Sequence, residues 1–414
     1  MKKAVFWVIF LLITISLVLT LGSCRRETGP SKITLTMGSW RADDVAQMNN
    51  LLAAYKGLNP NVEIQFRPTN PPEYNATLRL QLDSGTGPDL MYARSYATGQ
   101  ELFNSGYFGN NSDIPGVSQN FTSSNAAPWQ MPNGTFFAVP FAAVSHAVYY
   151  NKTIFQREGL TVPQTWEDFL SLCATLFSKG ITPLANGIAD EWDILEVFFL
   201  NMLPNFIGGS ADRLQYESGA KKLNDAGWVA AFQAVADTAR FLPRGWESVT
   251  YNDSQALFAN QQAAMFLDGS WTAGTYDGVP FNWGVFATPA PRGRNTIIVF
   301  HPDMAITYNA KTTHPQEARA FLAWIASREG ATEASKALPL GFFPMINFPI
   351  QLDNAHANEF LSLNQGKETD ARFVWPKFME LYSPMNQAVI QVLRGAMTPA
   401  QAANAMETEA AKLR

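Results

Sequence analysis

The chain has 414 residues, a formal net charge of −5 and a 13% aromatic content that includes 11 tryptophans. This length exceeds the size at which one hydrophobic core keeps growing, so we expect two lobes. The acidic balance, with no basic block after Arg25 and Arg26, argues against nucleic acid as a partner.

The first residues predict export. Lys2 and Lys3 precede an uncharged apolar run over 4–21, and Leu21-Gly22-Ser23-Cys24 forms a cleavage site of small residues. The cysteine in the last position resembles the lipobox of bacterial lipoproteins. We therefore expect a signal peptide over 1–23, a lipid on Cys24, a polar tether over 24–31, and an extracytoplasmic protein anchored to the bacterial membrane by lipid alone. An uncleaved transmembrane helix is the alternative, because such a run can just span a bilayer.

Cys173 is the only other cysteine, so we expect no disulfide in the exported part. It ends the stretch Phe169-Leu170-Ser171-Leu172-Cys173, which is typical of a buried helix face. A structural thiol is therefore predicted, not a nucleophile.

Apolar and polar residues alternate over 33–37, which predicts a strand. Asp43 or Asp44 can cap the helix that follows, with an apolar face formed by Val45, Met48, Leu52 and Tyr55. Further strands are predicted over 62–67, 90–93, 136–140, 147–150, 263–267 and 304–308, and further helices over 73–83, 166–178, 193–202, 229–241, 253–260, 318–325 and 399–413. Strands that alternate with helices predict an α/β fold with mainly parallel, doubly wound sheets.

In open α/β sheets, ligands bind beyond the carboxyl ends of the strands. Three segments directly follow predicted strands and combine aromatic rings with hydrogen-bonding groups: Ser39-Trp40-Arg41, Arg94-Ser95-Tyr96 and Asp268-Gly269-Ser270-Trp271. These segments are the first candidates for a binding site.

Seven motifs in order resemble the extracellular solute-binding proteins of ABC importers, in the carbohydrate-binding branch that includes maltodextrin-binding proteins. The resemblance extends from Ile33 to about Leu413. Its landmarks are Trp40 after the first strand, Tyr55-Lys56-Gly57-Leu58-Asn59-Pro60-Asn61-Val62, Gly85-Thr86-Gly87-Pro88-Asp89-Leu90, Val139-Pro140-Phe141, Tyr149-Tyr150-Asn151-Lys152, Pro163-Gln164-Thr165-Trp166-Glu167-Asp168-Phe169 and the segment 263–271 that ends in Trp271.

The resemblance implies a two-lobed periplasmic-binding-protein-like fold, with a cleft and hinge between the lobes. The N-terminal lobe would comprise 32–143 and 297–343, and the C-terminal lobe 144–296 and 344–414. It also implies capture of a sugar in the cleft by a monomer, closure of the lobes and delivery to the transmembrane subunits of an ABC permease. Phe300-His301-Pro302-Asp303 departs from the family, which often has glycines there, and Val144 replaces a ligand-binding acid of some relatives.

Sugar rings present an apolar face to aromatic side chains and a rim of hydroxyls to charged or amide groups. Trp271 and Trp40 are the predicted stacking platforms, and a core position is the alternative for both. Arg41, Arg94, Ser95 and Asp268 are candidate hydrogen-bonding partners, with surface or helix-capping roles as alternatives. The remaining candidates are His301 and Asp303 at the cleft floor, Trp192 and Trp375 from the second lobe, and Tyr96 and Phe141.

We expect no enzyme, cofactor or metal site. The four histidines are scattered, and no His-Glu-x-x-His, Gly-x-Ser-x-Gly or phosphate-binding glycine loop occurs. Ser218-Gly219-Ala220-Lys221 matches Ser-x-x-Lys by chance, because the companion motifs are absent. A glycosidase needs only two carboxylates, so it stays an alternative. A binding protein for a phosphorylated or polyamine-type solute and a surface adhesin are the others.

Overall fold

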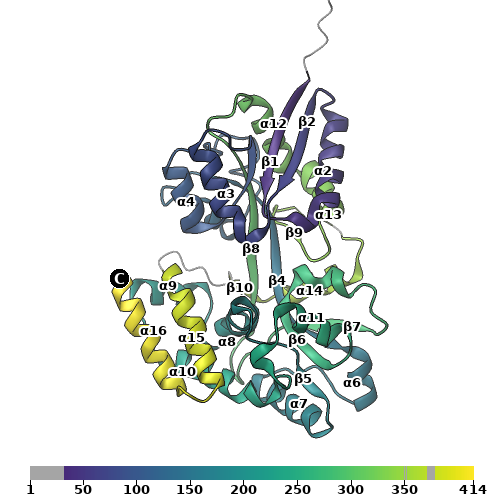
Figure 1. Ribbon diagram of the computed structural model, residues 1–414, viewed down its shortest axis with the longest axis vertical. Helices are drawn as coiled ribbons and strands as arrows, with labels where there is room; N and C mark the ends of the chain where they lie inside the picture. The colour runs from purple at the N-terminus through teal and green to yellow at the C-terminus, as the bar shows by residue number, and fades with distance from the viewer. Residues whose placement is uncertain (1–31, 349, 351, 371–377) are drawn as a thin grey trace, which may run out of the picture.

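The computed structural model describes residues 32–348, 350, 352–370 and 378–414. Cys24 and Trp375 therefore lie outside the described residues. Figure 1 shows two bodies, one above the other, and two long strands that run from one to the other: β4 (Val139–Asn151) and β8 (Ile297–Tyr308).

The upper body is built on the strands that begin the chain. β1 (Ile33–Ser39) pairs in parallel with β2 (Val62–Pro68) and β3 (Leu90–Ala93), and β3 pairs antiparallel with β8. Its helices are α2 (Val45–Leu58), α3 (Pro71–Asp83), α4 (Tyr96–Asn104), α5 (Ser123–Ala126), α12 (Pro315–Ile325) and α13 (Arg328–Ala337). The carboxyl end of β1 points toward the lower body (Figure 1), and so does that of β3, which runs parallel to β1.

The lower body continues the same sheet. β6 (Ala263–Gly269) and β7 (Trp283–Phe286) pair antiparallel with β4, β5 (Thr182–Leu184) pairs in parallel with β6, and β10 (Glu368–Asp370) pairs in parallel with β8. β9 (Phe343–Pro344) joins β4 between the bodies. The helices are α6 (Lys152–Glu158), α7 (Trp166–Ser178), α8 (Leu200–Ile207), α9 (Ser210–Ser218), α10 (Ala226–Thr238), α11 (Tyr251–Ala259), α14 (Ala355–Leu363), α15 (Tyr382–Leu393) and α16 (Pro399–Leu413), with a π-helical stretch over Asp193–Phe199.

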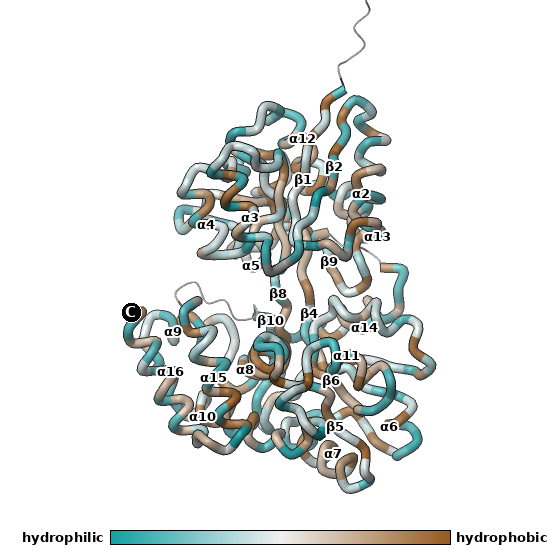
Figure 2. The backbone as a smooth tube through the Cα atoms, in the orientation of Figure 1, coloured by the Kyte–Doolittle hydropathy of each residue, from teal (hydrophilic) through white to brown (hydrophobic). Residues whose placement is uncertain are grey.

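Each body has its own hydrophobic core. One cluster lies in the upper body around Leu35, Met91 and Phe321, and two lie in the lower body around Phe199 and around Tyr149. In Figure 2, hydrophobic residues dominate α8 and alternate with hydrophilic ones along α16, as expected for a buried helix and a surface helix. Cys173 is fully buried, which confirms the prediction of a structural thiol, and burial raises its pKa.

The α/β class is confirmed, and α7 and α16 have the predicted bounds. One strand, β4, replaces the two strands predicted over 136–140 and 147–150: it begins at Val139, so 136–138 lie outside it, and it runs on to Asn151 because its residues are buried almost without interruption. The pairing is mixed: β4 is antiparallel to each of its neighbours, whereas β8 is antiparallel to β3 and β4 but parallel to β10. The predicted lobe boundaries stay a prediction, since both strands run on without a break where the bodies meet.

Candidate functional site

The segments selected from the sequence lie where the two bodies meet. β4 runs from the upper body into the lower body, and β6 runs back antiparallel beside it, so the carboxyl end of β6 faces the junction from below (Figure 1). The carboxyl ends of β1 and of β3, which is parallel to β1, face the junction from above (Figure 1). Ser39-Trp40-Arg41, Arg94-Ser95-Tyr96 and Ser270-Trp271 directly follow those ends. The junction is therefore the candidate site.

Three aromatic side chains of the lower body form what we call the aromatic group: Trp192, Tyr251 and Trp271. The ring centroids of Trp192 and Tyr251 lie 3.9 Å apart, and those of Trp192 and Trp271 lie 6.0 Å apart at an interplanar angle of 32°. Trp271 Nε1–H donates a hydrogen bond of 2.8 Å to the Tyr251 hydroxyl. Because both indoles are only partly buried, the group offers fixed aromatic surface to a bound molecule.

Asp268 lies beneath the aromatic group and is fully buried. Its carboxylate accepts hydrogen bonds from the Tyr251 hydroxyl (2.8 Å), the Thr272 hydroxyl (3.0 Å) and the amide of Gly269 (2.7 Å). Burial raises the pKa of Asp268 well above its usual range. In this position Asp268 holds Tyr251, and through it Trp271.

Asp193 anchors the segment that carries Trp192. It accepts hydrogen bonds from the Ser254 hydroxyl (2.6 Å), the Asn186 amide (2.8 Å) and the Gly187 N–H (3.1 Å), and burial raises its pKa to about 6. Ser254 belongs to α11, the helix that begins at Tyr251. Trp192 and Tyr251 are thus joined through a buried carboxylate as well as through their rings.

Ser270 ties the aromatic group to the chain that comes back from the upper body. Its hydroxyl accepts from the N–H of Ser145 (2.9 Å) and donates to the carbonyl of Gly341 (2.5 Å). Gly341 has φ +93°, and a Cβ there would lie 1.7 Å from the Ser270 carbonyl oxygen, so only glycine fits.

Two of the predicted residues of the upper body, Trp40 and Phe141, are buried. Trp40 is 4% exposed and packs edge-on against Tyr74 and Tyr92, while the Arg94 guanidinium lies 3.7 Å from the centroid of its ring. Phe141 is 3% exposed and contacts Tyr92. The structure therefore places Trp40 and Phe141 in the core beside the junction, and their predicted role in binding stays a prediction.

Polar candidates surround the crossing strands. Arg41 pairs with Asp44 and lies 4.7 Å from the centroid of Phe342. His301 Nε2 and Asp303 Oδ1 on β8 are 3.9 Å apart. Ser95 is the N-cap residue of α4, and Tyr96 follows it with φ +54°.

The sequence did not point to a second polar cluster, which we call the ionic group: Arg213 and Glu217 on α9 and Asp370 on β10. Arg213 Nε lies 3.3 Å from both carboxylate oxygens of Asp370, and Arg213 Nη1 donates to Glu217 at 3.1 Å. Tyr251 and His146, whose ring lies 5.2 Å from that of Trp271, were missed as well. The only sequence signal near Tyr251 is the Thr250–Asp253 capping pattern, which predicts that Tyr251 lies in the first turn of a helix.

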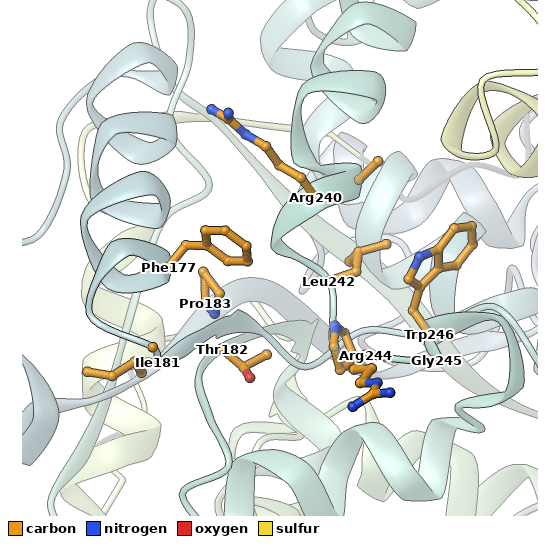
Figure 3. Close-up of a pocket in the computed structure, with 12 residues that line it drawn as sticks. Phe177, Ile181, Thr182, Pro183, Arg240, Leu242, Arg244, Gly245 and Trp246 are labelled. Atoms are coloured by element: carbon orange, nitrogen blue, oxygen red, sulfur yellow. The ribbon is translucent and has the colours of Figure 1, made fainter.

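A cavity of ≈ 550 Å³ lies elsewhere in the lower body (Figure 3). Its walls come from the end of α7, strand β5 and the turn after α10, and they include Phe177, Pro183, Arg240, Arg244 and Trp246. None of the predicted binding residues lines this cavity. The cavity is therefore not part of the candidate site at the junction.

In the described part of the chain, no group of three or more histidine, cysteine or acidic side chains could hold a metal ion. No single helix in that part is long and apolar enough to cross a membrane. The adjoining pair Asp193–Ile207 and Ser210–Ser218, bent by 91°, meets the length and composition requirements together.

The family model of the bacterial extracellular solute-binding proteins matches residues 50–348, well over half of the chain. The multiple sugar-binding protein of Streptococcus mutans is 26% identical over 315 residues, or 73% of each chain. The sn-glycerol-3-phosphate-binding periplasmic protein UgpB of Rhizobium meliloti is 25% identical over 249 residues, 56% of this chain and 53% of UgpB.

Among solved structures, unliganded RafE from Streptococcus pneumoniae superposes with a TM-score of 0.76 at 21% identity, covering 93% of this chain and 99% of RafE. RafE has also been solved in complex with raffinose. This likeness confirms the fold of a solute-binding protein over nearly the whole described chain. The family match shows that this chain belongs to the bacterial extracellular solute-binding proteins of ABC transporters, a non-enzymatic family.

Proposed function

We propose that this protein captures a neutral carbohydrate at the junction of its two bodies and delivers it to the membrane subunits of an ABC importer. The aromatic group carries the proposal. Its two partly exposed indoles are held at fixed angles by Tyr251 and by the buried Asp268. Aromatic planes of this kind match the apolar face of a sugar ring, and polar groups placed around them select its hydroxyls.

The pairing of two arginines near the junction favours a neutral solute over a phosphorylated one. Arg41 is paired with Asp44, and Arg213 is paired with both Asp370 and Glu217. A phosphate monoester needs guanidinium or ammonium groups whose charge is not already compensated. The similarity to UgpB makes such a solute the second candidate, but the paired arginines argue against it.

Movement of one body against the other would couple capture to transport. A solute that touches both bodies makes its full set of contacts only when they are closed, so binding shifts the equilibrium toward that state. β4 and β8 are the connections about which such a movement would occur. The closed form would then be recognised by the permease, with the protein held near it through the lipid on Cys24.

Thermal denaturation of the chain from Arg25 onward tests the proposal. A neutral saccharide at 100 times its Kd should stabilise the protein by about 2.7 kcal/mol and raise its Tm by several degrees, with no product released. A shift with sn-glycerol 3-phosphate alone would favour the second candidate. Release of a shorter sugar would indicate a glycosidase, and the absence of any shift with small solutes would favour an adhesin.

A further inference from the structure

The cavity of Figure 3 has no part in the proposed function, yet it has the dimensions of a binding site. Its volume of ≈ 550 Å³ lies within the usual range for ligand cavities, roughly 300–1,000 Å³. Among the described strands β5 pairs only with β6, so the sheet ends at this cavity. In Figure 1, α7 and β5 lie at the end of the lower body that points away from the upper body. The cavity therefore belongs to one body alone.

The walls of the cavity combine exposed and half-buried aromatic rings. Phe177 is 55% exposed and is the only exposed aromatic residue of the described chain. Its ring packs edge-on against that of Phe241, with the ring centroids 6.1 Å apart. Trp246 is half-buried and packs against the core of the lower body. Apolar surface that stays exposed beside a hollow is typical of an interaction site.

Two arginines flank these apolar walls. In Figure 3, Arg240 extends above the apolar side chains and Arg244 extends below them. Both are exposed, and among the described residues neither guanidinium lies within ion-pair distance of a carboxylate. None of the residues that line the cavity is acidic, and the neighbouring Glu247 is paired with Arg394 at 2.8 Å. In a chain of net charge −5, the hollow thus carries a local positive charge on two sides.

This combination fits a segment of another protein better than a small solute or a membrane. Aromatic residues and arginine are enriched where proteins bind each other, whereas lysine and acidic residues are depleted. Because the two guanidinium groups lie on opposite sides of the hollow (Figure 3), a single small anion reaches only one of them. An extended peptide can place an apolar side chain in the hollow and a carboxylate on each side. A flat lipid surface does not fill a concave hollow.

We propose that this cavity binds an acidic segment of a partner protein, with an apolar residue in the hollow and aspartate or glutamate on both sides of it. Phe177 and Trp246 contact the apolar residue, and Arg240 and Arg244 contact the flanking carboxylates. The proposal goes beyond the proposed function and does not rest on it, because these four residues lie outside the candidate site. Since all four belong to the lower body, the partner binds whether the bodies are open or closed. A permease that recognises the closed form would not.

Fluorescence anisotropy with labelled peptides tests the proposal. The probe is the peptide Glu-Asp-Phe-Leu-Asp-Glu, and the neutral Gln-Asn-Phe-Leu-Asn-Gln is its counterpart of the same size. We expect the acidic peptide to bind about tenfold more tightly, and added salt to weaken its binding because the arginines are exposed. The double variant Arg240→Gln/Arg244→Gln should lose this preference, and Phe177→Ala should weaken the binding of both peptides.

The double variant Arg157→Gln/Arg292→Gln is the matched control, because both arginines are exposed on the lower body and neither lines the cavity. It should bind both peptides as the parent does. Equal affinity of the parent for the two peptides, or an unchanged preference in Arg240→Gln/Arg244→Gln, would overturn the proposal.

Two other occupants are tested with the same variants. Phenylbutyrate that bound as tightly as the acidic peptide would indicate a site for small anions and contradict the proposal. Sedimentation with phosphatidylglycerol vesicles that Arg240→Gln/Arg244→Gln abolished would indicate a membrane contact and contradict it as well. The thermal shift with saccharides reports on the proposed function separately, and Arg240→Gln/Arg244→Gln should retain it.

Discussion

At the scale of single residues, the site depends on aromatic rings that buried carboxylates hold in place. Trp271 contacts His146 and Trp192, donates to Tyr251, and covers Gly269 so closely that a Cβ on Gly269 would lie 1.9 Å from its ring. Its orientation is thus determined by neighbours on four segments. Such preorganisation lowers the entropy cost of binding.

Replacing Trp271 with alanine should weaken sugar binding at least tenfold, because the stacking surface is lost while Tyr251 and Asp268 remain. Trp246→Ala, which removes a half-buried indole at the cavity shown in Figure 3, is the matched control and should bind normally. Calorimetry would give both affinities, and circular dichroism would confirm that both variants fold. Equal affinity of Trp271→Ala and the parent would remove Trp271 from the site.

Asp193 should make the stability of the protein depend on pH. Its pKa is raised from 3.8 to about 6, so the folded state binds more protons than the unfolded state between these values. Its contribution is therefore fully present below about pH 4 and is lost as pH rises through about 6, a change of about 3 kcal/mol.

Urea unfolding at several pH values, compared between the parent and Asp193→Asn, would isolate this contribution. Between about pH 4 and pH 6, the unfolding free energy of the parent should fall relative to that of Asp193→Asn, and the difference should level off above pH 6. The exposed Asp237, changed to asparagine, provides the control. Parallel pH profiles for the parent and Asp193→Asn would show that Asp193 does not titrate in this way.

At the scale of elements, helix caps decide where site residues point. Thr250 caps α11 by accepting from the N–H of Asp253 (3.2 Å), and the Asp253 carboxylate accepts from the N–H of Thr250 (3.0 Å). This capping box places Tyr251 at the first position of the helix, beside Trp192.

Thr250→Ala should destabilise the protein by about 1 kcal/mol and weaken sugar binding, because the first turn of α11 carries Tyr251. Thr398→Ala removes an equivalent capping box from α16, a helix outside the junction. It should cost similar stability in urea unfolding but leave the sugar affinity unchanged. A loss of affinity in both variants would mean that lower stability, and not the position of Tyr251, weakens binding.

At the scale of the whole molecule, two bodies share β4 and β8, and β1 begins at the end of the upper body that lies away from the lower body (Figure 1). The proposed lipid on Cys24 would keep the protein at the membrane while its bodies open and close. Lipid attachment adds about 0.8 kcal/mol of membrane affinity for each buried methylene group.

Cys24→Ser should therefore move the protein from the membrane fraction to the soluble fraction of expressing cells, because the acyl chains can no longer be attached. Fractionation followed by immunoblotting would show this, with Cys173→Ser as the control for loss of a thiol. A Cys24→Ser protein that still sedimented with membranes would favour the alternative of an uncleaved helix.

Much of this could be predicted from the sequence alone. The pattern of strands and helices indicated the α/β class, because hydrophobic periodicity is a local property. The segments that follow β1, β3 and β6 led to the junction, because ligand sites in such sheets follow the ends of strands. Trp271 and Trp192 were among the predicted residues that the structure brings together.

What the tertiary structure alone decided are the relations between segments far apart in the chain. Tyr251 and Asp268 meet across 17 residues and Arg213 and Asp370 across 157, and no local pattern marks either pair. Trp40, Trp192 and Trp271 are all tryptophans that the sequence marked as candidate binding residues. Trp40 nevertheless packs in the core, whereas the other two are only partly buried. Local periodicity determines which face of an element is apolar, whereas exposure and charge pairing depend on how the elements pack against each other.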